Sequence, residues 1–211
     1  MNFSLKIPFY ISAIFVLFCF SCNNGKEKKP NKVIFPAASG AQSKSAGNGL
    51  DKSPMDMIYF PPEYPILKMS GKMENDPYVR VIYSRPQLEG RKIFGEILQF
   101  GKPWRLGANE ATEIEFFRDV RIMNTSIKKG RYIMYAIPYE TEWEIRLNNN
   151  LYIWGLNVDS SYDIANFTIP ATTGERKLEV FSMEFSPNNS GADLVLGWDT
   201  LRVSIPIFWT P

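Results

Sequence analysis

Hydrophobic and polar residues alternate through much of the chain from residue 78 onward, as in strands that bury one face. In residues 143–148 we expect Trp143, Ile145 and Leu147 on the buried face, with polar residues between them. Residues 201–207 alternate in the same way. Residues 131–138 are apolar on both faces and are therefore expected in the middle of a sheet.

The rest of the pattern predicts more strands and little helix. A short helix is expected at 91–101, where Ile93 pairs with Ile97 and Phe94 with Leu98 at a spacing of i, i+4. Together with the three segments above, about nine short strands predict an all-β fold, an antiparallel β-sandwich of jelly-roll or immunoglobulin-like type. The further strand segments are 78–85, 113–117, 120–123, 164–170, 178–185 and 192–198.

The N-terminus has the pattern of a lipoprotein signal. After Lys6, residues 7–20 form an apolar run that is shorter than the roughly 18 residues needed to span a bilayer. Ser21 precedes Cys22, so cleavage between them would leave Cys22 to carry the lipid. An ordinary secretory signal is the alternative. The predicted organisation is a signal peptide (1–21), a lipidated Cys22 with a flexible tether (22–52), and one β-sandwich domain (53–211).

Charge and cysteine content limit the partners of that domain. Residues 53–211 contain 17 Lys and Arg against 20 Asp and Glu, whereas residues 22–52 contain 6 Lys against 2 acidic residues. The basic character therefore belongs to the tether, and we expect no nucleic-acid partner. The only two cysteines are Cys19 and Cys22, so the domain has no thiol and must rely on its hydrophobic core.

The absence of histidine from the sequence removes the common nucleophilic triads and imidazole metal sites. No phosphate-binding glycine motif occurs either. We therefore expect no metal and no cofactor. The enzyme class that stays open is a glycan hydrolase that uses a pair of carboxylates.

The segment "KPWRLGANEAT", residues 102–112, is polar and aperiodic and therefore a candidate site. Arginine is seldom placed beside apolar strands without a partner, and its planar guanidinium suits a carboxylate or a sugar acid. In the alternative interpretation the arginines pair with Glu110 and backbone carbonyls and tie the connection to the sheet. Gly107 and Asn109 are expected in turns with positive φ. The candidate ligand-binding residues are Arg85, Arg91, Trp104, Arg105, Asn109 and Glu110.

Three elements of the chain are specific in combination, Tyr83–Pro86, Gly90 with Arg91, and Trp104–Thr112. Together they resemble the bacterial envelope family catalogued as domain of unknown function 2911. The resemblance implies a β-sandwich-like domain in a secreted or lipid-anchored protein, and it implies no reaction. Members usually read Asp-Val-x-Arg-Val where this chain reads "DIANFT" from Asp163, so any role of a basic group at that place in the family is not carried over to this chain.

These observations favour a lipid-anchored cell-envelope protein that binds a partner protein or a small ligand. The expected location is a bacterial envelope membrane, the outer membrane in particular, with contact through the N-terminal lipid. Two alternatives stay open, a structural accessory of an envelope complex and the carboxylate-based glycan hydrolase.

Overall fold

Nine strands and one α-helix make up the regular structure of the protein in a computed structural model, which describes residues 51–210. The predicted signal peptide, Cys22 and the tether up to residue 50 lie outside the described residues. In chain order the elements are β1 (Met55–Phe60), α1 (Tyr64–Met69), β2 (Val79–Ser84), β3 (Glu113–Phe116), β4 (Val120–Ile122), β5 (Thr125–Ile127), β6 (Gly130–Pro138), β7 (Glu142–Asn148), a 3₁₀ turn (Ser160–Tyr162), β8 (Asp163–Asn188) and β9 (Gly191–Trp209).

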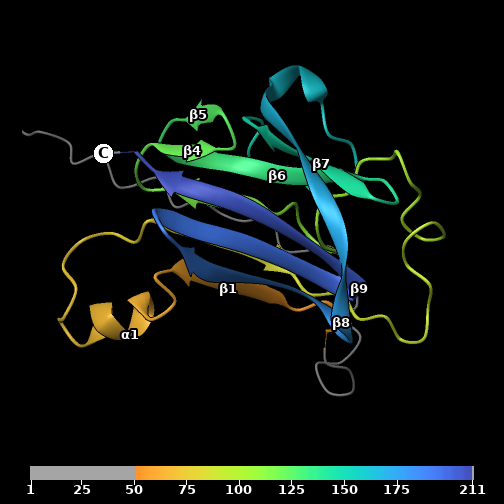
Figure 1. The fold of residues 1–211 in the computed structure, drawn as a ribbon, viewed down its shortest axis with the longest axis horizontal. Coiled ribbons are helices and arrows are strands. Elements are labelled where there is room, and N and C mark those ends of the chain that lie inside the picture. Colours follow the sequence, from red (N-terminus) through yellow and green to blue (C-terminus); the bar gives the residue numbers. More distant parts are fainter. Residues whose placement is uncertain (1–50, 211) are drawn as a thin grey trace, which may run out of the picture. The chain divides into compact units, whose positions relative to one another are not determined.

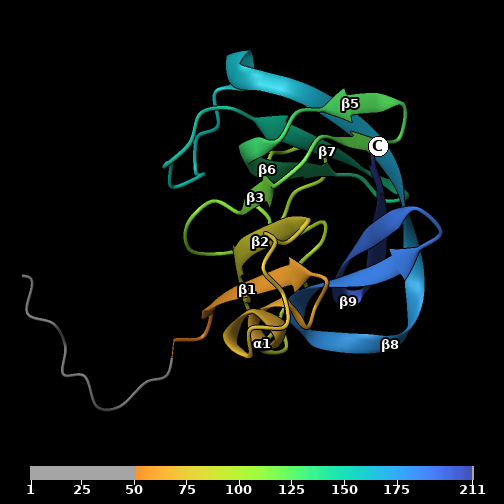
Figure 2. The ribbon, with the colours of Figure 1, turned by 90° about the vertical axis from the view of Figure 1, so that its left-hand side faces the viewer.

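The strands form one antiparallel sheet in the order β1-β2-β3-β6-β7-β8-β9-β4-β5. The long strand β8 connects its two parts, because residues 163–170 pair with β7 and most of the remainder pairs with β9. The β8–β9 hairpin lies beside β1 in both ribbon views (Figures 1 and 2). The sheet therefore folds back on itself and encloses a core.

Aromatic rings fill the centre of this core. The rings of Trp104 and Trp198 stack with centroids 5.8 Å apart, and Phe181 lies 5.0 Å from Trp104. Trp143 of β7 and Phe94 contact the same tryptophan at 5.6 and 6.1 Å. Such rings bury large apolar areas and add about 0.5–1.5 kcal/mol per pair, so the core depends on residues from distant parts of the chain.

The prediction of an all-β antiparallel fold is confirmed, and so are its clearest strands. Trp143, Ile145 and Leu147 of β7 are all buried, as are nearly all residues of β6. The predicted strands 164–170 and 178–185 are parts of the single strand β8, and 192–198 and 201–207 are likewise parts of β9. The jelly-roll or immunoglobulin-like arrangement stays a prediction.

The helix predicted at 91–101 is wrong. Gly95 has φ +85°, outside the helical region, and its N–H donates to the Leu98 carbonyl at 2.9 Å in a turn. Burial of Ile93 and Phe94 in the core overrides the helical spacing. The α-helix is instead the short α1, in which none of the described residues is buried. Among residues 51–210 no helix has the length and apolar character to cross a membrane.

Candidate functional site

Residues 104–112, which we call the motif segment, are attached to strand β6 at both ends. Trp104 and Ala136 exchange two backbone hydrogen bonds of 2.7 and 2.9 Å, and the Thr112 carbonyl accepts from the Met134 N–H at 2.8 Å. The residues between these attachments leave the sheet as a loop. Inside the loop the Trp104 indole donates to the Gly107 carbonyl at 3.0 Å, and the Thr112 hydroxyl donates to the Leu106 carbonyl at 2.8 Å.

The prediction of positive φ for Gly107 and Asn109 is wrong, because Leu106 takes that conformation with φ +55°. Gly107 is needed for a different reason. A β-carbon at this position would lie 2.5 Å from the hydroxyl oxygen of Ser84 and within 3.3 Å of the Ser84 backbone. The glycine therefore allows the motif segment to approach strand β2.

Ser84 is the residue that joins strand β2 to the motif segment. Its side chain is fully buried, and its hydroxyl oxygen accepts hydrogen bonds from the N–H groups of Ala108 at 2.7 Å and Asn109 at 3.1 Å. A buried N–H without an acceptor is costly, so this one hydroxyl stabilises the loop at two points. The two sequence motifs, 83–86 and 104–112, are thus parts of one structural unit.

Tyr83 and Arg85, on either side of Ser84, attach β2 to β1 and β8. The Tyr83 hydroxyl accepts from the Met183 N–H at 2.9 Å and lies 3.3 Å from the Asp56 carboxylate. Burial raises the pKa of Tyr83 to about 12. Arg85 forms an ion pair with Asp56 at 3.2 Å and donates to the Phe181 carbonyl at 3.4 Å. We assign both side chains a structural role.

The alternative interpretation, in which the arginines pair with Glu110 and with backbone carbonyls, is confirmed for the carbonyls and wrong for Glu110. Arg105 donates to two backbone carbonyls, those of Ala108 and Trp154, the latter at 3.1 Å. Glu110 is exposed and has no hydrogen bond or ion pair within residues 51–210. Asn109 donates its side-chain amide to the Ser53 carbonyl at 2.7 Å, which holds the start of the domain against the motif segment.

The connection between β7 and the 3₁₀ turn, residues 149–159, lies across the motif segment, and we call it the strap. Its Trp154 carbonyl accepts the hydrogen bond from Arg105. Gly155 has φ +81°, and a β-carbon there would lie 2.9 Å from the β-carbons of both Arg105 and Ala111. The buried Asn148 side chain donates to the Asp159 carbonyl at 2.9 Å. These contacts fix the strap at its middle and at its far end.

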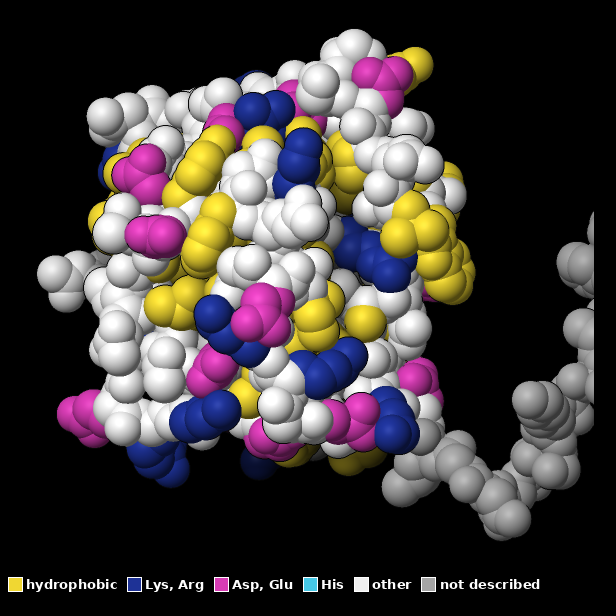
Figure 3. All heavy atoms as spheres, turned by 90° about the vertical axis from the view of Figure 1, so that its right-hand side faces the viewer, with side chains coloured by type: hydrophobic (Ala, Val, Ile, Leu, Met, Phe, Trp, Pro, Cys, Tyr) yellow, Lys and Arg dark blue, Asp and Glu magenta, His cyan; other side chains and the backbone are white. Residues whose placement is uncertain are grey.

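A cleft of about 350 Å³ lies along one side of the strap, and we call it the arginine cleft. Its walls are mostly apolar, with Ile93, Leu98, Trp104, Leu156 and Trp198 among them, and Arg91 and Arg105 are its charged residues. Figure 3 shows the side of the molecule that is on the right in Figure 1, where basic, acidic and hydrophobic side chains are intermixed.

Neither arginine of this cleft has an acidic partner in the described part of the chain. Arg91 donates to the carbonyls of Leu88 at 2.9 Å and Gln87 at 2.6 Å. Burial lowers the pKa of the Arg105 guanidinium, because the partly dehydrated charge has no carboxylate beside it. Arg91 is exposed and helps to lower the pKa of the nearby Glu89 carboxyl, so Arg105 is the positive charge of this cleft that no neighbouring carboxylate compensates.

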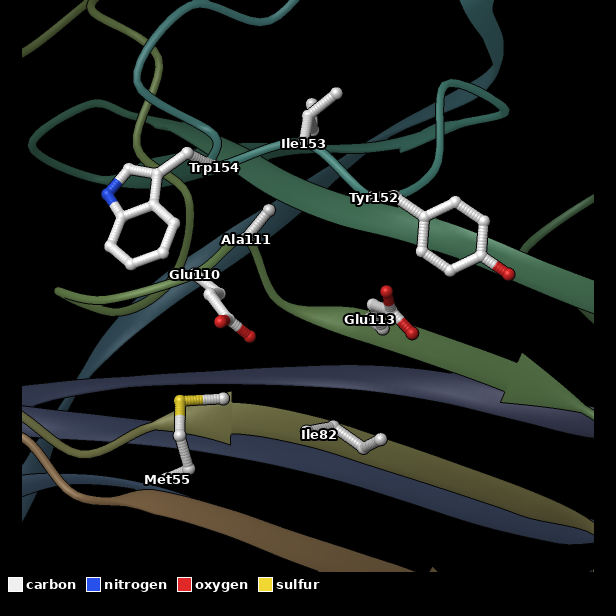
Figure 4. A pocket seen from close by; sticks show the side chains of 8 residues that line it. All are labelled: Met55, Ile82, Glu110, Ala111, Glu113, Tyr152, Ile153 and Trp154. Carbon is white, nitrogen blue, oxygen red and sulfur yellow. The ribbon is translucent and has the colours of Figure 1, made fainter. Parts of the chain in front are cut away.

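A second cleft, of about 310 Å³, lies near the other end of the motif segment, and we call it the glutamate cleft. Tyr152 and Trp154 of the strap lie on one side of it, and Met55 of β1 and Ile82 of β2 on the opposite side (Figure 4). The carboxylates of Glu110 and Glu113 extend into the space between them (Figure 4).

The six residues predicted for a ligand site therefore separate into three groups. Arg91, Trp104 and Arg105 line the arginine cleft, and Glu110 lines the glutamate cleft. Arg85 and Asn109 line neither cleft. Sequence reasoning missed the strap, although "LYIWGL" carries large apolar side chains in a segment that does not alternate like a strand.

Comparison of the sequence with known protein families gives one match. The family described as Protein of unknown function (DUF2911) matches residues 65–207, which is more than half of the chain. The chain belongs to the DUF2911 family. No curated protein and no solved structure matches it.

The DUF2911 match contains both motifs, the strap and almost all of β9, but it begins after β1. Strand β1 nevertheless completes the region described above, since Met55 lines the glutamate cleft and Asp56 pairs with Arg85. Within residues 51–210 no group of three or more His, Cys, Asp or Glu residues could hold a metal ion.

Proposed function

We propose that this DUF2911 protein is a lipid-anchored protein of the bacterial cell envelope, at the outer membrane, that binds a small anionic ligand with an apolar body. The observation that supports the proposal is the arginine cleft, where neither Arg91 nor Arg105 forms an ion pair among the described residues and Arg105 is partly buried. A carboxylate or phosphate would supply the missing negative charge, and the apolar walls would cover an alkyl or ring system.

The geometry of the guanidinium groups favours a ligand over a purely structural role. Each arginine uses part of its five donors on backbone carbonyls, which fixes the side chain and leaves other donors for a ligand. Pre-positioned donors lower the entropy lost on binding. The apolar residues around them, such as Leu156, would otherwise remain in contact with water.

The hydrolase alternative receives less support. Glu110 and Glu113 line the same cleft, but both come from one short segment, residues 110–113. The two carboxyl groups of a glycosidase flank the scissile bond from either side. We therefore develop the binding function and not a hydrolytic one.

The anchor is tested by replacing Cys22. Cys22→Ala removes the thiol that would carry the lipid, so we expect the protein to leave the membrane fraction, because acyl chains provide the anchoring energy. Fractionation of cells with detection of the protein measures this. Cys19→Ala is the matched control, since this cysteine would be removed with the signal peptide. Membrane association of the Cys22→Ala protein at the level of the unchanged chain would contradict the anchor.

The ligand class is tested with octanoate and its uncharged analogue octanamide on a soluble form that begins at residue 51. We expect octanoate to bind and octanamide to bind at least about tenfold more weakly, since a charge-assisted hydrogen bond is lost. Arg91→Gln and Arg105→Gln should each weaken octanoate binding by about tenfold in calorimetric titrations. Arg121→Gln is the control, because Arg121 also donates to a backbone carbonyl but does not line the cleft. Equal binding of the two compounds would contradict the proposal.

A further inference from the structure

The glutamate cleft has a chemistry opposite to that of the arginine cleft and requires a separate explanation. No Lys or Arg residue lines it. Glu110 has no ion pair among the described residues, and the ion pair of Glu113 is a long one, with Arg131 at 3.6 Å. By contrast, nearby carboxylates of the same sheet are closely paired, Glu115 with Arg80 and Asp163 with Arg146. The cleft therefore carries negative charge that the protein itself leaves largely uncompensated.

Aromatic side chains are held exposed beside these carboxylates. Tyr152 and Trp154 are 82% and 55% exposed, although such large rings are usually buried. The backbone that carries them is held at Trp154, whose carbonyl accepts a hydrogen bond from Arg105. Tyr152 itself has φ +62°, an uncommon and costly conformation for a residue with a side chain. The strap thus presents two rings to the cleft at a cost in free energy.

Exposed aromatic faces together with an unpaired carboxylate, here that of Glu110 among the described residues, are the chemistry that recognises a cation with an apolar stem. A guanidinium group satisfies both parts, because it is planar, stacks on aromatic faces and offers five donors to carboxylate oxygens. The side chains of Met55 and Ile82 on the opposite wall would contact the aliphatic stem.

The place of the cleft in the sheet points to a polypeptide as the carrier of this group. Met55, which lines the cleft, belongs to β1, which pairs with β2 and has the β8–β9 hairpin beside it. Met57 of the same strand is also largely exposed. The cleft therefore lies on the outer face of β1, β2 and β3, where exposed side chains such as that of Met57 can contact residues that neighbour an arginine in a polypeptide.

We propose that the glutamate cleft binds an arginine side chain of a partner polypeptide. The guanidinium lies between Glu110 and Glu113 and stacks on the Trp154 or Tyr152 ring, and the stem contacts Met55. This interaction goes beyond the binding of an anionic ligand, since it uses a different cleft and the opposite charge. Arg105 also holds the strap through the Trp154 carbonyl, so the two activities are separated by variants of Glu110 and Arg91, each of which lines one cleft only.

The experiment uses the full mature chain and three short peptides, acetyl-Gly-Arg-Gly-amide and the versions with citrulline and lysine in place of arginine. Citrulline keeps the shape of arginine without its charge. We expect the arginine peptide to bind at least about tenfold more tightly than the citrulline peptide and about threefold more tightly than the lysine peptide. Nuclear magnetic resonance titration measures such weak binding.

Substitutions in the cleft locate the interaction. Glu110→Gln and Glu113→Gln should each weaken binding of the arginine peptide about tenfold, and Trp154→Ala should weaken it about threefold. Glu110→Gln is not expected to disturb folding, because Glu110 is exposed and unpaired within residues 51–210. Glu140→Gln is the control, an exposed glutamate outside the cleft. Octanoate binding should be unchanged in Glu110→Gln, which separates this test from that of the arginine cleft.

Three results would overturn the proposal. The first is equal affinity for the arginine and citrulline peptides, which would remove the role of the charge. The second is unchanged binding in both glutamine variants, which would place the interaction elsewhere. The third is tighter binding of the lysine peptide, which would favour the chain's own N-terminal tether, because residues 22–50 contain lysine but no arginine.

Discussion

Trp104→Ala is expected to destabilise the protein by about 3–5 kcal/mol, the range measured for removal of a large buried side chain. Trp104 is 5% exposed and its ring contacts four other aromatic rings. The substitution would leave a cavity among them and remove the indole donor to the Gly107 carbonyl. Urea denaturation followed by circular dichroism measures the free energy of unfolding.

Trp154→Ala is the matched control for this prediction. Trp154 is 55% exposed, so its removal should change the free energy of unfolding by less than about 1 kcal/mol. The difference between the two losses in the free energy of unfolding distinguishes a tryptophan of the core from one on the surface. A loss below about 1.5 kcal/mol for Trp104→Ala would mean that the Trp104 ring contributes little to the core, contrary to its packing.

Ser84→Ala is expected to cost about 2–4 kcal/mol, because the N–H groups of Ala108 and Asn109 lose a shared buried acceptor. Gly107→Ala should cost about 1–3 kcal/mol, since its β-carbon would lie 2.5 Å from the Ser84 hydroxyl oxygen. The same denaturation measurement applies to both variants.

The double variant tests whether these two effects have one origin. Once the Ser84 hydroxyl is absent, the closest contact of the β-carbon introduced at position 107 is gone, so the combined loss should be smaller than the sum of the single losses by about 1 kcal/mol or more. Strict additivity would show that Gly107 does not serve to admit the Ser84 side chain.

Most of the sheet could be predicted from the sequence because its strands bury one face or both. In β7 the apolar residues of the alternating pattern are buried, and in β6 the continuous apolar run is buried on both faces, as expected. The sequence could not show that pairs of predicted strands are continuous. The segment 171–177 between the two apolar parts of β8 is largely polar; its first three residues pair with β9, and pairing resumes at Leu178 after a register shift.

The elements that were missed lack such a pattern. In β1 the apolar Met55 and Met57 are exposed, whereas the polar Asp56 between them contacts Tyr83 and Arg85. The hydrophobic pattern of β1 therefore does not indicate which face is buried. The helix predicted at 91–101 failed for a related reason. Its apolar spacing serves core contacts of Phe94 with Trp104 and Trp198, and no helix is needed to make them.

The candidate site could be predicted only as a region. The sequence indicates that arginines and a tryptophan are concentrated near residue 104, but spacing along the chain gives no distances between side chains. One of the two interpretations paired the arginines with Glu110 and with backbone carbonyls. Arg105 does bind backbone carbonyls, but Glu110 stays exposed. The strap approaches from residues 149–159, and only the tertiary fold brings it to the motif segment.

The measurement that tests the central claim most directly is amide chemical-shift mapping on the soluble form that begins at residue 51, titrated with octanoate. The account predicts saturable shifts confined to the residues around the arginine cleft, among them Arg91, Arg105 and Leu156, with no comparable shifts at the remote Arg121. It also predicts that Arg91→Gln weakens the titration. Absence of saturable shifts, or shifts concentrated on a surface away from the cleft, would contradict the account.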